Sequence, residues 1–202
     1  MPLNIVNRRS FFRDCALVGT SVGVGSLLPH LFHRQFESSA VADETPHPSF
    51  EQRLKELKIE LPPPSKPVAI YAPAIVTGNL LFTAGHIPWL PDGKLQQGRV
   101  GADLTLEQGA DAARLVGLHL LTTLQQTLGS LDRVVRLVKA LGIVNCTSDF
   151  TQQPKVINGF SELMVQVFGE VAGKGGRSAI GAGSLPSNVP VEIEAIFEVR
   201  PT

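Results

Sequence analysis

The sequence has few cysteines, few aromatic residues and no surplus of charge of either sign. Of its 202 residues, two are cysteine, one is tryptophan and one is tyrosine. Lysine and arginine together number 18, and aspartate and glutamate also number 18. A chain without a strong positive field lacks the electrostatic footprint of a typical nucleic-acid-binding protein. We therefore expect no nucleic-acid partner.

The small number of cysteines also excludes an internal disulfide in the domain that we expect to remain after processing. Cys15 falls in an N-terminal segment that we expect to be removed, which leaves Cys146 alone. No base lies near Cys146 in the sequence, so a buried strand residue is expected there rather than a nucleophile. Three of the five histidines, His47, His86 and His119, fall in the expected mature chain, where they are scattered and suggest no metal site.

The N-terminal apolar run is too short to span a bilayer. Arg8 and Arg9 precede an aromatic pair and a glycine- and serine-diluted apolar stretch, residues 15–28, which is shorter than the roughly 20 residues of a membrane span. The pattern resembles a twin-arginine export signal, and Ala40-Val41-Ala42 resembles a signal-peptidase site. We therefore expect a signal peptide over residues 1–42, a mature chain from Asp43, and a periplasmic or secreted bacterial protein that meets the membrane only during export.

Two other interpretations of this N-terminus stay open. The basic and apolar residues are also compatible with a cytoplasmic protein, or with an uncleaved segment that remains as a membrane anchor. Removal of residues 1–42 takes away four cations and two anions, which leaves 14 basic and 16 acidic residues. The mature chain is then a mildly acidic soluble domain.

The rest of the chain divides into an arm and one domain. Residues 43–65 are expected to form a loose N-terminal arm and linker, with a short helix beginning near Ser49 and ended by three successive prolines. Residues 66–202 are expected to form the domain. Its expected elements are strands at 68–77, 80–84 and 96–100, a helix at 105–128, a strand at 131–146, a helix at 154–168, and two strands within 175–199.

Two local patterns carry most of this prediction. Thr105 and Gln108 form a capping-box signature at the start of the long helix, and Gly129 is a plausible stop. In the stretch 191–199 the odd positions are apolar and the even ones are mainly acidic. We expect an α+β sandwich in which two helices cover the apolar face of one sheet, and the other face meets neighbouring subunits of an oligomer.

Several short motifs point to one family. Arg177 follows two glycines and precedes two strand-like runs with almost no other cation. The motifs are Tyr71, Gly78-Asn79, Thr83-Ala84-Gly85-His86-Ile87-Pro88, Asn158, Arg177-Ser178, Leu185-Pro186 and Val191-Glu192-Ile193-Glu194-Ala195. Over about residues 66–200 they resemble the reactive-intermediate deaminase (RidA, YjgF) family, also labelled endoribonuclease L-PSP/chorismate mutase-like. The resemblance implies a chorismate-mutase-like mixed sheet with two helices on one face, and a homotrimer with three clefts between subunits.

The resemblance also implies roles for five residues. Arg177 grips the carboxylate of a 2-imino acid, and Glu192 handles the attacking water. Tyr71, Gly85 and Asn158 belong to the substrate-binding neighbourhood. The implied reaction releases a 2-keto acid and ammonia without a metal or an organic cofactor.

The chemistry of the two principal residues agrees with these roles. A guanidinium presents paired N–H donors that match a carboxylate, and a carboxylate can orient a water and take its proton. We expect Arg177 and Glu192 on the same sheet face, with the turn at 185–188 bringing their strands side by side. Three positions depart from the family pattern and leave the substrate open: Ala84 replaces a common serine, Ala179 a common cysteine, and His86 a common glutamine.

Plainer interpretations also stay open. Arg177 could form an interface salt bridge, Glu192 could be a solvated strand carboxylate, Tyr71 could be an interface aromatic, and Asn158 could bond to backbone groups near a helix start. Three functions follow: a deaminase of small 2-imino acids or enamines, a trimer that binds small carboxylates or ketones without turnover, and a ribonuclease. The ribonuclease is the weakest, because the mature domain is net acidic.

Overall fold

The computed structural model describes residues 49–64 and 69–201. The predicted signal peptide over residues 1–42 lies outside these ranges and stays a prediction. His47 also lies outside the described residues. Within the described ranges, no helix has both the length and the apolar character needed to cross a membrane.

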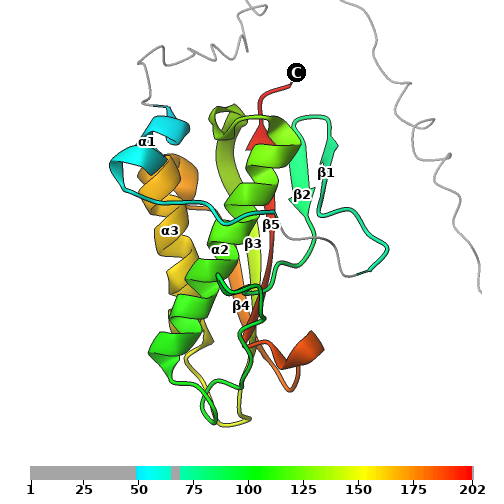
Figure 1. Ribbon diagram of the computed structural model, residues 1–202, viewed down its shortest axis with the longest axis vertical. Helices are drawn as coiled ribbons and strands as arrows, with labels where there is room; N and C mark the ends of the chain where they lie inside the picture. The colour runs from blue at the N-terminus through cyan, green and yellow to red at the C-terminus, as the bar shows by residue number, and fades with distance from the viewer. Residues whose placement is uncertain (1–48, 65–68, 202) are drawn as a thin grey trace, which may run out of the picture. The chain divides into compact units, whose positions relative to one another are not determined.

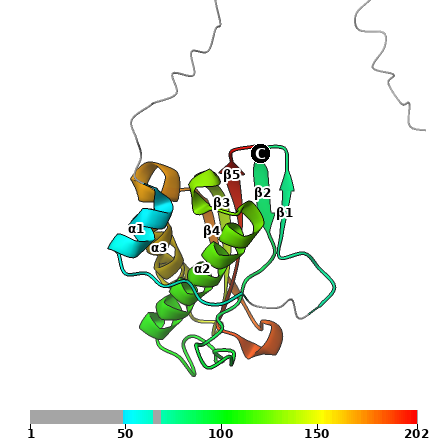
Figure 2. The same ribbon diagram turned by 45° about the horizontal axis from the view of Figure 1, so that its top comes forward.

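A five-stranded mixed sheet is covered on one face by two long helices (Figures 1 and 2). The strands lie in the order β1-β2-β5-β3-β4, and all neighbours are antiparallel except β3 and β4, which are parallel. Their bounds are Ala74–Thr77 (β1), Leu80–Thr83 (β2), Val134–Asn145 (β3), Gly176–Ala182 (β4) and Val191–Val199 (β5). The helices on the covered face are α2, Leu106–Leu128, and α3, Gln153–Gly173. The predicted α+β architecture is confirmed.

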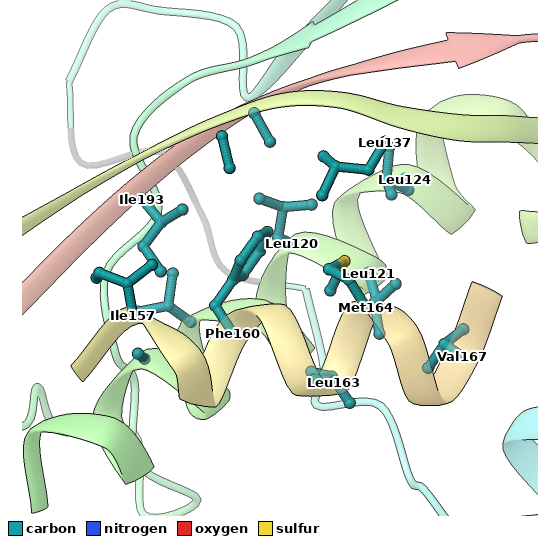
Figure 3. Close-up of a cluster of buried hydrophobic side chains, with 14 of the residues drawn as sticks. Leu120, Leu121, Leu124, Leu137, Ile157, Phe160, Leu163, Met164, Val167 and Ile193 are labelled. Carbon is teal, nitrogen blue, oxygen red and sulfur yellow. The ribbon is translucent and has the colours of Figure 1, made fainter. Parts of the chain in front are cut away.

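The core lies between this sheet and the two helices. Ile193 and Phe197 of β5 are fully buried there, while Glu194 between them is exposed on the other face, so the predicted alternation is confirmed. Figure 3 shows Ile193 of the sheet above Phe160 of α3 and Leu120 of α2. Burial of such side chains contributes about 1.5–3 kcal/mol each relative to exposure, so this layer is a major source of the fold's stability.

The predicted ends of α2 are also confirmed. The Thr105 hydroxyl accepts from the Gln108 backbone N–H at 3.2 Å, and the Gln108 side chain accepts from the Thr105 N–H at 2.9 Å. Gly129 ends the helix in the left-handed region with φ 80°. Such local signals depend on neighbouring residues alone, which is why the sequence predicts them well.

Two strands predicted in the N-terminal part of the domain are shorter than expected or absent. β1 begins only at Ala74, and the expected strand over residues 96–100 makes isolated bridges instead of a ladder. The Gly98 N–H donates to the carbonyl of Asn188 at 2.9 Å, and Gly98 itself has φ 124°. A backbone in that region leaves the extended conformation, so the segment cannot continue as a strand.

The helix α3 runs further than the predicted residues 154–168. Gly169, the expected stop, has φ 83° and interrupts the helix, which then resumes and ends at Gly173. The glycines at 173 and 175 lie tightly against backbone atoms of Met164 and Leu137, so a side chain at either position would clash. The glycines before β4 therefore allow the backbone to pass close to α3 and β3.

The predicted pairing of the last two strands is wrong. Ala140 of β3 pairs with Arg177 of β4 on one side and with Ala195 of β5 on the other, so β3 lies between the two strands. The chain passes from β3 through α3 into β4 as a parallel crossover, which places β4 at the sheet edge. The segment after β4 then leads across β3 to β5 rather than into a hairpin.

The N-terminal helix α1, Phe50–Glu56, is anchored rather than loose. The Asp132 carboxylate accepts from the Phe50 N–H and from the Ser49 hydroxyl, both at 2.6 Å. In return, the Glu51 carboxylate accepts from the Leu131 N–H at 3.0 Å, at the start of the short 3-10 helix Leu131–Arg133. Each carboxylate thus satisfies free N–H groups at the other helix's N-terminus.

Candidate functional site

Arg177 lies on the edge strand β4 and is held by α3. Its Nη1 donates to Asn158 Oδ1 and to Ser161 Oγ, both at 2.9 Å, and its Nη2 donates to the Pro154 carbonyl at 3.3 Å. The side chain is nevertheless exposed. Two of its five N–H groups, including that on Nε, have no partner among the described residues. The guanidinium is therefore oriented in advance and can still receive a carboxylate.

A pocket of about 530 Å³ lies beside this guanidinium, between α3 and the edge of the sheet. Leu137, Ala140 and Val165 provide apolar wall, and Asn158, Ser161 and Arg177 provide polar groups. Lys174 and Glu170 form an ion pair at its border. The combination of apolar wall and convergent polar groups is typical of small-molecule sites.

Glu192 lies on the uncovered face of the sheet, next to Gly85. A methyl group at position 85 would overlap the Glu192 carboxylate, so glycine is what leaves room for that group. The Gly85 segment is tied to β5, because the His86 N–H donates to the Ile193 carbonyl at 2.8 Å and the Ile193 N–H donates back at 3.0 Å. Gly85 and Glu192, both predicted as site residues, thus lie side by side within one protomer.

The surroundings of Glu192 favour its protonated form. Burial raises the pKa of this carboxyl above its ordinary value, and the negative charge of Glu194, two residues along the same strand face, raises it further. A carboxyl with a raised pKa is suited to exchanging protons closer to neutral pH than an exposed glutamate.

A stability measurement tests this electrostatic setting without any activity assay. A carboxyl whose pKa is raised on folding destabilises the fold progressively as pH rises from the ordinary carboxyl pKa through the raised one. Glu192→Gln cannot ionise, so we expect its Tm to exceed that of the parent at pH 7 and the gap to close near pH 4. The rise should be no more than a few degrees, because the half-exposed group is partly screened. If the parent and Glu192→Gln have the same Tm at pH 7 as well as at pH 4, the raised pKa of Glu192 is contradicted.

Arg177 and Glu192 lie on opposite faces of the sheet, which corrects the prediction that they share one. Arg177 pairs with Ala140, a buried residue of the helix-covered face, whereas Glu192 pairs with Ile143 and faces away from the helices. Strand β3 also separates them. One protomer therefore does not bring these two side chains to a common cleft.

The predicted site residues consequently form two groups. The first, the arginine group, consists of Arg177 and Asn158, which the structure brings together by a hydrogen bond. The second, the glutamate group, consists of Glu192 and Gly85. Tyr71 is 45% exposed and lies three residues before β1. β1 pairs with β2, the strand that leads into Gly85, and just beyond this pair the Ala84 N–H donates to the Pro73 carbonyl at 2.8 Å.

Two partners of Arg177 were not predicted from the sequence. Ser161 and the Pro154 carbonyl complete its contacts with α3. Ser161 could have been found, because it follows Asn158 by three positions and residues so spaced share a helix face. The Pro154 carbonyl could not, since a backbone acceptor leaves no mark in the sequence.

The described histidines have structural partners. His86 and His119 are buried, and burial lowers the pKa of each. The His119 Nε2 lies 3.0 Å from the Trp89 carbonyl, and His86 contacts Ala84 and Thr123. Among residues 49–64 and 69–201 no group of three His, Cys, Asp or Glu side chains could hold a metal ion. Cys146 is buried, as predicted, but it follows the last residue of β3 instead of lying within the strand.

The uncovered sheet face carries an exposed apolar patch. Ile75, Phe82 and Ile180 on this face are 59%, 39% and 49% exposed, and Leu141 and Ile196 are half-buried between them. Exposed apolar side chains gathered on one face of a sheet are typical of a surface that another molecule covers. The apolar patch lies on the same face as the glutamate group.

The chain matches a family model described as "YjgF/chorismate_mutase-like, putative endoribonuclease" over residues 51–195. It is 38% identical to Protein TCP17 of Trypanosoma cruzi over 147 residues, which cover 73% of this chain and 92% of that protein. A solved protein of unknown function from Agrobacterium tumefaciens is also 38% identical, with a TM-score of 0.68 and coverage of 75% and 94%. A putative endoribonuclease from Shewanella oneidensis is 32% identical, with a TM-score of 0.71 and coverage of 75% and 99%. By its sequence and its mixed sheet alike, the chain belongs to the YjgF/chorismate mutase-like family.

Proposed function

We propose that this protein hydrolyses small 2-imino acids, or the enamines in equilibrium with them, to 2-keto acids and ammonia. The observation that carries the proposal is the oriented, exposed Arg177 guanidinium, which presents free N–H groups beside a pocket. A guanidinium held in this way favours a carboxylate-bearing ligand. The half-buried Glu192 with its raised pKa supplies the group that exchanges protons.

The proposed reaction needs only these two side chains, the substrate and water. Arg177 binds the substrate carboxylate. Glu192 takes a proton from water as the water oxygen attacks the imine carbon, and it passes that proton to the imine nitrogen, which gives a carbinolamine with a C–N single bond. Glu192 then takes the hydroxyl proton of the carbinolamine and passes it to the same nitrogen, so that the C–N bond breaks, ammonia leaves and the hydroxyl oxygen becomes the carbonyl of the 2-keto acid. The proposal requires no metal ion or organic cofactor.

We further propose that the site is completed between subunits of a homotrimer. The arginine group and the glutamate group lie on different faces of one protomer, so a neighbouring copy has to supply one of them. Association through the apolar patch would remove that surface from water and cover the face that carries Glu192. The proposed site then consists of Arg177 and Asn158 of one subunit with Glu192, Gly85 and Tyr71 of its neighbour.

A coupled assay that generates 2-iminopropanoate tests the proposal. The parent protein should speed release of ammonia, and Arg177→Ala should lower kcat/KM by about 10–100-fold, since hydrogen bonds to charged groups contribute about 1.5–3 kcal/mol. Arg114→Ala is the matched control, because Arg114 also donates to an α3 residue, Gln166, but lies outside both groups. The methyl ester of the same imine should react poorly. Equal rates for acid and ester, or full activity of Arg177→Ala, would overturn the assignment.

A second candidate is a trimer that binds small carboxylates or keto acids without turnover. The pocket beside Arg177 favours it equally, because carboxylate binding needs the guanidinium but not Glu192. Binding of pyruvate that Arg177→Ala abolishes, without imine turnover by the parent, would identify this alternative. The third function, ribonuclease, appears in the descriptions of the family and of the Shewanella protein. Nucleic-acid binding usually depends on several lysine and arginine contacts to phosphates, whereas the arginine and glutamate groups together contain one cation, Arg177.

A further inference from the structure

His86 follows Gly85 directly and has no part in the proposed reaction, yet both of its ring nitrogens have partners. Nδ1 lies 2.8 Å from the Ala84 carbonyl oxygen, and Nε2 lies 2.8 Å from Thr123 Oγ1 on α2. The side chain is only 7% exposed. His86 thus connects the segment beside Glu192 to the helix layer on the other side of the sheet.

The directions of these hydrogen bonds follow from their chemistry. A carbonyl oxygen only accepts, so the Nδ1–H donates to Ala84. Burial lowers the pKa of His86. The hydrogen bond to the Ala84 carbonyl opposes this shift, and repulsion by a positive charge on His119 adds to it. In the neutral ring Nε2 accepts, and the Thr123 hydroxyl donates to it. The ring is therefore held in one tautomer and one orientation.

This orientation determines how the Ala84–Gly85 peptide is presented. The described chain contains no cis peptide bond, so the Ala84 carbonyl and the Gly85 N–H point in opposite directions. Because the Ala84 carbonyl is turned toward the His86 ring, the Gly85 N–H is turned away from it. No described residue accepts a hydrogen bond from that N–H. The Glu192 carboxylate lies against Gly85.

We propose that His86 is a positioning residue: by holding the Ala84 carbonyl it keeps Gly85 where the Glu192 carboxylate requires it, and keeps the Gly85 N–H free as a donor to the reacting substrate. His86 itself touches neither water nor substrate in this scheme. Its kinetic consequences depend on the proposed function. A displaced Gly85 would push against the Glu192 carboxylate, and a rotated peptide would withdraw the donor.

The first arm of the test is kinetic and uses a matched pair of buried histidines. His119 also bonds to one backbone carbonyl, that of Trp89, but belongs to neither site group. His86→Leu should lower kcat by about 10–100-fold with little change in KM, because small misplacements of reacting groups cost up to about 10²-fold. His119→Leu should leave kcat within about twofold, although loss of a buried hydrogen bond lowers the Tm of both variants. Equal falls in kcat, or none for His86→Leu, would overturn the proposal.

Two further variants separate positioning from folding. His86→Asn places an amide N–H near the position of Nδ1, so it should recover most of the lost kcat. Thr123→Val removes the hydroxyl that orients the ring, and it should lower kcat less than His86→Leu does. These variants keep the proposal testable if His86→Leu does not fold. If the kcat of His86→Asn does not exceed that of a folded His86→Leu, the positioning role is overturned. An unchanged kcat in Thr123→Val would also contradict it.

The second arm needs no activity. The carbon-detected NMR signal of the Glu192 carboxyl, which is distant from position 86 in the sequence, should change in His86→Leu and stay as in the parent in His119→Leu. If the parent hydrolyses no imine, the proposed function fails, while these spectra still decide whether His86 positions Gly85 and Glu192. Unchanged spectra in His86→Leu would reject the positioning role even in an active enzyme.

Discussion

Glu192→Gln is expected to lower kcat for 2-iminopropanoate by about 10²–10⁴-fold, the usual contribution of a general base. Glutamine keeps the shape of the side chain next to Gly85 but cannot take a proton from water. Binding of the substrate carboxylate depends on Arg177, so KM should change much less than kcat. Steady-state kinetics at pH 7 measure both constants, and a kcat close to that of the parent would remove Glu192 from the mechanism.

Glu194→Gln is the control for this prediction, because it changes the pKa of Glu192 without removing it. The negative charge of Glu194 raises that pKa, so its loss should lower the pKa and let Glu192 ionise at a lower pH. The acidic limb of the kcat profile should therefore move to lower pH, while the rate at neutral pH stays close to that of the parent. If the acidic limb of the kcat profile does not move, the pKa of Glu192 does not determine that limb.

Mixing two impaired variants is expected to restore activity. Because Arg177 and Glu192 lie on opposite faces, a shared site takes its arginine from one subunit and its glutamate from the next. Arg177→Ala subunits supply an intact Glu192, and Glu192→Gln subunits supply an intact Arg177. In randomly mixed trimers about one site in four receives both intact residues, so activity should return to about a quarter of the parent value.

The experiment requires evidence that the subunits associate and exchange. Scattering on residues 43–202 should report about three times the mass of one protomer. Native mass spectrometry of differently labelled variants should then detect mixed trimers. The double variant Arg177→Ala/Glu192→Gln, mixed with Arg177→Ala, contains no intact Arg177 and should show no recovery beyond the residual activity of Arg177→Ala. Mixed trimers without recovered activity, or a stable monomer, would overturn the shared site.

Local patterns in the sequence were sufficient for the two ends of α2 and for the faces on which the residues of β5 lie. The capping box at Thr105 and the glycine at 129 depend only on hydrogen bonds within one turn of helix. Alternation in β5 correctly assigned Ile193 to the core and Glu194 to the uncovered face, since successive side chains of a strand point to opposite sides. The motifs around Arg177 and Glu192 were sufficient to identify the family, which the comparisons confirmed.

The relation between Arg177 and Glu192 was decided only by the tertiary structure. Fifteen residues separate them, and the short segment between their strands favoured a hairpin, but β3 pairs with both strands and lies between them. Alternation specifies a side chain's face within one strand and says nothing about which distant strand will be its neighbour. That choice depends on burying the apolar faces of all strands against α2 and α3 together. The sequence by itself therefore determined the fold class and the residue types of the site, whereas the packing of the sheet placed Arg177 against α3 and Glu192 on the opposite, uncovered face.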